Sequence, residues 1–227
     1  MQLPKRDPLL RLIEHVEGYA FHEQDTVGDI RQLVASFSNH EVAEAFIAQL
    51  PAIRESLRTD VEALLQNDPA ATGRDEIIAC YPGILVMSHY RTAHALLNLQ
   101  VPIVPRMITE LAHSHTGIDI HPAAQIGDYF AIDHGTGVVI GATTIIGHHV
   151  MLYQGVTLGA KNFKYDEKGC PLDQPRHPII EDNVTIYSNT TILGRVRIGH
   201  DTIIGGNLWI THDVSPRSRI VQNNLLI

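Results

Sequence analysis

The sequence predicts an α+β fold, because two halves of the chain follow different hydrophobic periods. From Asp7 to about Ser114, apolar residues recur at the helical spacings of three and four, whereas beyond Gly117 they recur every six residues. A chain of 227 residues that is 44% hydrophobic can bury a sizeable core. We therefore expect a helical N-terminal domain over residues 1–116, a repeat domain over 117–216 and a C-terminal tail over 217–227.

The N-terminal half is expected to be an all-α domain of short helices. Asn39 is a residue type that caps helix N-termini, and the segment after it, HEVAEAFIAQL, places Val42, Ala45, Phe46 and Leu50 on one face. The other expected helices cover residues 51–66, 76–78, 84–99 and 104–113, separated by NDPAATG, YPG and QVPIVP. In the first of these breaks, Asp68 can act as the N-cap of a helix that Pro69 initiates.

The second half contains three runs in which Ile, Leu or Val recurs every six residues. The runs cover residues 120–138, 140–158 after a shift of two, and 180–210. In the last run, the third residue after each Ile is mostly Asn or Asp, which tolerate positive φ. These corner positions are Asn183, Asn189, Arg195, Asp201, Asn207 and Asp213, and the residues after them are small, branched or apolar: Val184, Thr190, Val196, Thr202, Leu208 and Val214. Each unit is therefore expected to be a short strand and a corner.

Repeats of this length cannot bury an apolar face alone, so they must stack on one another. Three units would form one coil, and residues about 18 apart would then lie one strand spacing, roughly 4.8 Å, above each other. A sandwich with unusually regular strands is the alternative. Residues 160–177 break the period with charged residues, Gly and Pro, and are expected to form a loop extruded from the coil.

Composition excludes several classes of function. The net charge is −8, and the 17 Lys and Arg residues form no run, which argues against binding to nucleic acid or to an anionic membrane. The chain has no signal-peptide pattern and no apolar segment of about 18 residues, so a cytoplasmic protein is expected. Cys80 and Cys170 have neither metal-ligand nor redox spacing and are expected to be reduced thiols. No nucleotide-binding fingerprint is present either.

Two of the 14 histidines stand beside charged residues at expected corners. His134 follows Asp133, and His177 follows Arg176. An imidazole that is hydrogen-bonded to a carboxylate has a fixed tautomer and is a better general base. Asp119 lies one coil less three positions before His134, so the two side chains can share a corner; alternatively, Asp119 and Asp133 only cap turns. Arg176 can bind a carboxylate through two parallel hydrogen bonds, or it can be a solvated loop residue.

These residues resemble the serine O-acetyltransferases of the hexapeptide-repeat acyltransferase superfamily. The motifs are DIHPAAQIG at 119–127, IDHGTGVVIG at 132–141, YQGVTLGA at 153–160, RHP at 176–178 and ILGRVRIG at 192–199, with NDPA at 67–70 and YR at 90–91 as looser matches. The resemblance implies an all-α N-terminal domain followed by a left-handed parallel β-helix, assembled as a homo-trimer or a dimer of trimers. It also implies acetyl transfer from acetyl-CoA to L-serine, the first step of cysteine biosynthesis, with no permanently bound cofactor.

The same resemblance implies roles for individual residues. His134 matches the family's general base, and Asp119 matches the carboxylate that orients it. Asp68 and Asp133 match the acids that hold the ammonium group of serine, and Arg176 and His177 match the pair that binds its carboxylate. His134 and the Arg176–His177 segment are expected from different subunits. The expected acetyl-CoA contacts are Gly159, Ala160, Ser188, Gly205 and Gly206.

Some positions depart from the family pattern. Ala142 replaces a common Glu, and Ile203 stands where many relatives have a Lys near the CoA. Residues 160–175 form a longer loop than in the best-known bacterial forms, and PRSRIVQNN replaces the usual GVPA. The chain ends in Ile227, and a terminal Ile in the family inserts into O-acetylserine sulfhydrylase, which is therefore an expected partner.

Three other functions remain open from the sequence. The same scaffold can acetylate another acceptor, such as a sugar, although acidic and basic residues together suit a zwitterion better. It can also bind zinc through histidines, for which His148, His149, His177 and His200 are candidates, although no His triplet recurs at the required spacing and no metal is expected. A non-catalytic partner of the sulfhydrylase is the last alternative, and retention of Asp119 and His134 argues against it.

Overall fold

The computed structural model describes residues 4–162, 165–170, 172 and 174–222. The chain divides into two compact units. One comprises Met1–Thr116 with His121–Ala123, and the other comprises Gly117–Ile120 with Ala124–Ile227. None of the helices that the structure describes is long and apolar enough to cross a membrane.

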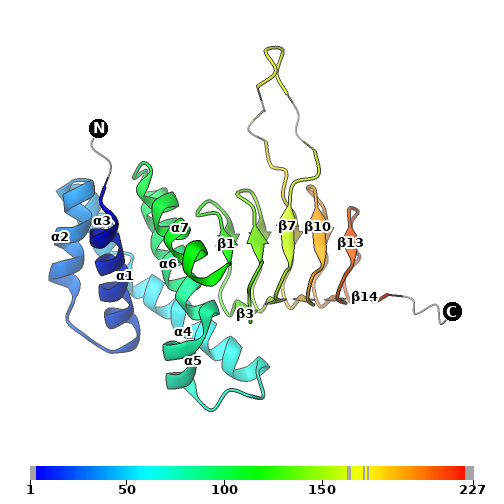
Figure 1. Cartoon of the computed structure of the whole chain (residues 1–227), viewed down its shortest axis with the longest axis horizontal. Coiled ribbons are helices and arrows are strands. Elements are labelled where there is room, and N and C mark those ends of the chain that lie inside the picture. Colours follow the sequence, from blue (N-terminus) through cyan, green and yellow to red (C-terminus); the bar gives the residue numbers. More distant parts are fainter. Residues whose placement is uncertain (1–3, 163–164, 171, 173, 223–227) are drawn as a thin grey trace. The chain divides into compact units, whose positions relative to one another are not determined.

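The first unit is helical, as predicted, and its helices are coloured blue to green in Figure 1. They are α1 (Arg6–Phe21), α2 (Val27–Phe37), α3 (His40–Ile47), α4 (Leu50–Asn67), α5 (Arg74–Cys80), α6 (Pro82–Asn98) and α7 (Val104–Thr116). The Asn39 cap is confirmed, because its side chain accepts a hydrogen bond of 2.9 Å from the Val42 N–H. On the predicted face of α3, Phe46 is buried, whereas Val42 and Ala45 are half-buried.

The core of the helical unit centres on α6, whose residues are mostly buried. It also contains a buried ion pair: the Arg91 guanidinium donates two hydrogen bonds, of 2.7 and 2.8 Å, to the Asp60 carboxylate. The side chains are 8% and 0% exposed. Two buried charges are tolerated here because each satisfies the other in bidentate geometry.

The second unit is a coil of parallel strands, and the predicted stacking of short repeats is confirmed. Three sheets run along the coil (Figure 1). The first sheet contains β1 (Asp119–Ile120), β4 (Val139–Ile140), β7 (Thr157–Gly159), β10 (Thr191–Leu193) and β13 (Trp209–Ile210). The second contains β2 (Gln125–Ile126), β5 (Ile145–Ile146), β8 (Ile179–Ile180) and β11 (Arg197–Ile198). The third contains β3 (Ala131–Asp133), β6 (Met151–Tyr153), β9 (Thr185–Ile186), β12 (Ile203–Ile204) and β14 (Arg219–Ile220).

The register shows where the six-residue period holds and where it is interrupted. Thr191 pairs with Trp209, as a coil of three six-residue units requires. Asp119 pairs with Val139, which lies two positions beyond the end of three such units, so the first coil is enlarged. Thr157 pairs with Thr191, because the extruded loop nearly doubles the length of that coil. The left hand of the coil, which the family resemblance implies, stays a prediction.

The corners between sheets are of two kinds. Among the non-glycine residues, positive φ occurs at the second-to-third corner, at Tyr129, His149, Asn183, Asp201 and Arg217, and at the third-to-first corner, at His134, Asn189 and Asn207, whereas at the first-to-second corner it is Gly194 that has positive φ. Among the described residues, the predicted positions Arg195 and Asp213 do not have positive φ. Both lie at the first-to-second corner, where the Asp213 carboxylate instead accepts a hydrogen bond from the Arg197 N–H. Asn and Asp therefore serve two corners through φ and the third through their side chains.

Candidate active site

His134 lies on an enlarged third-to-first corner between β3 and β4. This corner carries the two extra residues of the first coil, and three of its residues have positive φ: His134 (56°), Gly135 (85°) and Gly137 (80°). The side chain of His134 is 73% exposed, and its Nε2 lies 3.8 Å from a carboxylate oxygen of Asp133. The enlarged corner therefore presents an accessible imidazole with an acid beside it.

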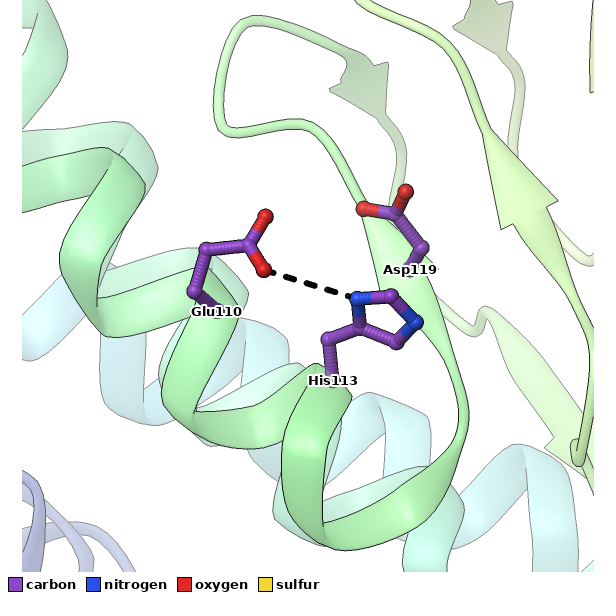
Figure 2. Close-up of side chains that lie close together, drawn as sticks. All are labelled: Glu110, His113 and Asp119. Carbon is purple, nitrogen blue, oxygen red and sulfur yellow. Dashed lines mark ion pairs between the residues drawn. The ribbon is translucent and has the colours of Figure 1, made fainter.

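Asp119 begins β1, in the same coil as this corner, and the Gly137 N–H of the corner donates to the carbonyl of Gly117, two residues before Asp119, at 2.9 Å. The sequence predicted that His134 follows Asp119 by one coil less three positions, and this is wrong. Asp119 pairs with Val139 rather than with Gly137, so His134 follows Asp119 by one coil less five positions. Asp119 and Asp133 both lie in strands rather than in turns. Figure 2 shows Asp119 on β1, and His113 facing Glu110 within helix α7. The His113 Nδ1 lies 3.6 Å from a Glu110 carboxylate oxygen.

Arg176 and His177 lie at the first-to-second corner, where the extruded loop rejoins the coil before β8. His177 is only 7% exposed. The backbone N–H groups of Arg176 and His177 donate to the Thr143 hydroxyl oxygen, at 2.9 and 3.1 Å. Within one chain, these two residues and His134 therefore occupy different corners of the coil.

Asp68 belongs to the helical unit, and the prediction that it caps a helix starting at Pro69 is wrong. Asp68 instead follows the last residue of α4. Its carboxylate accepts hydrogen bonds from the Ala70 N–H at 2.8 Å and from the Tyr81 hydroxyl at 2.6 Å. These two bonds fix the direction of the carboxylate.

The predicted acetyl-CoA contacts fall at two corners. Ser188 and Gly206 lie together at the third-to-first corner, where a Cβ on Gly206 would approach the Ser188 carbonyl oxygen to 3.0 Å. Gly205 follows β12 on the same edge of the β-helix, three turns from His134, which follows β3. Gly159 and Ala160 lie elsewhere, at the start of the extruded loop after β7. Three of the five therefore lie on the edge of the β-helix that carries His134, two and three turns away from it.

The histidines considered as zinc ligands lie in different turns or on different edges of the β-helix, except for the neighbours His148 and His149. His148, His149 and His200 lie at the second-to-third corner, and His177 lies at the first-to-second corner. His148 accepts a hydrogen bond from the Asp128 N–H at 3.1 Å, and His149 stacks on Tyr129 at 4.3 Å. His200 Nδ1 lies 2.7 Å from Asp201, whose pKa is lowered chiefly by this hydrogen bond. These rings therefore stabilise a corner.

Sequence reasoning assigned no role at the site to three residues around His177, namely Gly141, Thr143 and Arg195, although Gly141 and Arg195 lie within the quoted motifs. A Cβ on Gly141 would lie 2.0 Å from His177 Cδ2, so the ring packs directly against the Gly141 backbone. Arg195 donates hydrogen bonds to the backbone carbonyls of Thr143 and His177. These contacts join residues of different coils, and the extruded loop separates two of those coils. A local sequence spacing therefore does not predict them.

Comparison with known proteins supports the family resemblance found in the sequence. Residues 177–212 match the family model described as bacterial transferase hexapeptide (six repeats). A plasmid-encoded serine acetyltransferase of Synechococcus elongatus is 46% identical over 220 residues, which cover 95% of this chain and 69% of that protein. The chain belongs to the serine acetyltransferase family.

Other members of the serine acetyltransferase family agree in sequence and in fold. The enzyme of Bacillus licheniformis is 41% identical over 73% of each chain. The structure of serine acetyltransferase isoform 3 from Entamoeba histolytica, in complex with cysteine, matches with a TM-score of 0.81 and 35% identity, covering 99% of this chain and 85% of that chain. The Neisseria gonorrhoeae serine acetyltransferase in complex with serine matches with a TM-score of 0.73 and 26% identity, covering 96% and 86%.

Proposed function

We propose that this member of the serine acetyltransferase family transfers the acetyl group of acetyl-CoA to the hydroxyl of L-serine, giving O-acetyl-L-serine and CoA. The observation that carries the proposal is the exposed imidazole of His134 beside Asp133 on the enlarged corner, in a chain 46% identical to a serine acetyltransferase. An imidazole in this position can take the proton of an alcohol as the alcohol attacks a thioester.

In this mechanism His134 is the general base, and the acetyl group moves directly from sulfur to the serine oxygen. The serine oxygen bonds to the carbonyl carbon, the bond from carbon to sulfur breaks, and the proton taken by the base is available to the CoA thiolate. Asp119 orients the base. Asp68 and Asp133 bind the ammonium group of serine, and Arg176 with His177 binds its carboxylate. A covalent acyl-enzyme is not needed, because proximity and proton removal supply the rate.

Acetyl-CoA is assigned to Gly159, Ala160, Ser188, Gly205 and Gly206. Ser188, Gly205 and Gly206 support this assignment, because they lie along the same edge of the β-helix as His134, in the turns that follow β9 and β12. The coenzyme is a co-substrate and not a resident cofactor. We further propose that Ile227, which lies outside the described residues, docks O-acetylserine sulfhydrylase, and that the protein works in the cytoplasm.

The assembly we propose is a homo-trimer, or a dimer of trimers, of left-handed β-helices. Within one chain, His134 and the Arg176–His177 segment lie on different edges of the β-helix. The β-helix of a neighbouring subunit is therefore needed to place them around one serine molecule. Mixed assemblies of His134→Ala and His177→Ala chains test this. Activity in the mixture well above that of either variant alone supports shared sites, and activity no higher than the variants' own contradicts them.

The central experiment measures thiol release from acetyl-CoA with and without L-serine. We expect serine-dependent release that falls at least about a hundredfold in His134→Ala, because the base is removed. His149→Ala is the matched control, since that ring stacks on Tyr129 at another corner. Equal rates for wild type and His134→Ala would remove His134 from the mechanism. Faster release with homoserine or an amino sugar than with serine would reassign the acceptor.

A further inference from the structure

His177 is held at its side chain and at both of its backbone polar groups by two residues, Thr143 and Arg195, to which the sequence analysis gave no role at the site. The Thr143 N–H donates a hydrogen bond of 3.1 Å to His177 Nδ1, and the Thr143 hydroxyl lies 2.8 Å from the same nitrogen. The His177 N–H donates back to the Thr143 hydroxyl at 3.1 Å. A buried ring with these contacts has one orientation.

Arg195 closes the arrangement from another coil. One guanidinium nitrogen, Nη1, donates to the carbonyl of Thr143 at 2.6 Å and to the carbonyl of His177 at 3.0 Å. It thereby joins the residue that orients the ring to the residue that carries the ring. Arg195 also lines a cavity of about 340 Å³ with Lys161 and Arg176, but this nitrogen is already committed to two carbonyls. A positioning role therefore fits it better than ligand binding.

The Thr143 contacts also determine where the proton of the ring lies. A backbone N–H can only donate, so Nδ1 must be the acceptor and the neutral ring carries its proton on Nε2. The hydroxyl oxygen accepts from two N–H groups, which leaves its own hydrogen for Nδ1. The only hydrogen bond that the neutral ring can give is then from Nε2, which suits an acceptor such as a carboxylate.

We propose that Thr143 and Arg195 are positioning residues that fix His177 as the Nε2–H tautomer at the base of the extruded loop, so that it donates to the carboxylate of the amino-acid substrate. The proposal rests on the function proposed above for His177. Thr143 acts on the ring directly, and Arg195 acts through the carbonyls of both residues. Neither residue is assigned a contact with the substrate.

Steady-state kinetics of the serine-dependent reaction test the proposal. In Arg195→Gln and Thr143→Val we expect the KM for serine to rise about tenfold, with kcat changed less and the KM for acetyl-CoA unchanged. Thr143→Ser keeps the hydroxyl and should stay near wild type. Arg197→Gln is the matched control, because Arg197 lies two residues away and its side chain pairs with Glu181 at 2.6 Å. A serine KM in Arg195→Gln no higher than in Arg197→Gln would overturn the role of Arg195.

Nitrogen-15 NMR of the histidine rings gives a readout that does not depend on catalysis. The His177 signals are assigned by their loss in His177→Gln. We expect an unprotonated Nδ1 and a protonated Nε2 in wild type. Thr143→Val keeps the backbone N–H that donates to Nδ1, so we expect the same tautomer there, with an Nδ1 signal shifted by the loss of the hydroxyl contact. A proton on Nδ1 in wild type refutes the proposal even if the enzyme is active. If wild type shows no serine-dependent thiol release, the proposed function fails, and the ring signals still decide whether Thr143 sets the tautomer.

Discussion

Replacing Gly141 by Ala should displace the His177 ring. The added Cβ would lie 2.0 Å from Cδ2 and 2.1 Å from Nε2, far inside any real contact. Moving the ring breaks its two hydrogen bonds to Thr143, each of which contributes roughly 0.5–1.5 kcal/mol. Ala restricts the unfolded chain more than Gly does, and this partly offsets the loss by stabilising the folded state by roughly 0.4–1 kcal/mol. We therefore expect Gly141→Ala to lower the free energy of unfolding by about 1–2 kcal/mol. For a chain of this size, that corresponds to a fall in Tm of about 2–8 °C.

A double-mutant cycle with His177→Ala isolates this effect. Without the ring, the methyl group added at position 141 meets no imidazole, so Gly141→Ala should be neutral or slightly stabilising in that background. Thermal unfolding of the four proteins gives the interaction energy, expected at roughly 1–3 kcal/mol. The same destabilisation in both backgrounds would show that Gly141 is required for another reason and that the His177 ring is not held against it.

Three other predictions concern stability. Asp60→Ala should lower the free energy of unfolding by about 3–5 kcal/mol, because it leaves the buried Arg91 charge without this carboxylate; in urea titrations Asp60→Leu combined with Arg91→Met should cost less. Gly135→Ala should destabilise by about 1–3 kcal/mol, since φ is 85° and the Cβ would lie 2.4 Å from Ile118 Cδ1, and serine-dependent thiol release should fall with it. Burial raises the pKa of Glu17 above 4.5, so the folded state binds more protons than the unfolded state and stability falls as the pH rises from 4.5 through the folded pKa. Glu17→Gln should therefore raise Tm at pH 7 and not at pH 4, and an equal change at both would contradict this linkage.

The two periods of the sequence predicted the fold because each is a direct record of which residues are buried. The Ile residues of the last run, from Ile180 to Ile210, are all buried in the coil, as the six-residue spacing requires. Helix boundaries were less accurate: the segment expected over residues 76–78 is a helix over Arg74–Cys80. Its two ends carry charged and small residues, which leave no apolar period to extend.

Residues of the candidate site were predicted only where a local sequence feature, such as a histidine beside a charged residue, points to them. His134 and His177 stand beside charged residues, and both lie on corners of the coil, as expected. The residues that support His177 carry no such sign. Thr143 and Arg195 look like ordinary repeat residues, and their roles come from contacts that join residues 34 and 18 positions from His177. Periodicity predicts which coil follows which, but it does not predict which side chains reach across coils.

The places where the six-residue period fails are the places where the candidate chemistry lies. The two extra residues of the first coil create the corner that exposes His134. The lengthened coil that contains the extruded loop delivers Arg176 and His177 to the next corner. The regular coils bury one Ile per strand and join their strands by short corners. Regular repeats supply a rigid frame, and each interruption places a reactive side chain on it at one fixed position. Removing the two extra residues while keeping Asp133, His134 and Val138 should therefore preserve the coil, measured by circular dichroism, and abolish serine-dependent thiol release.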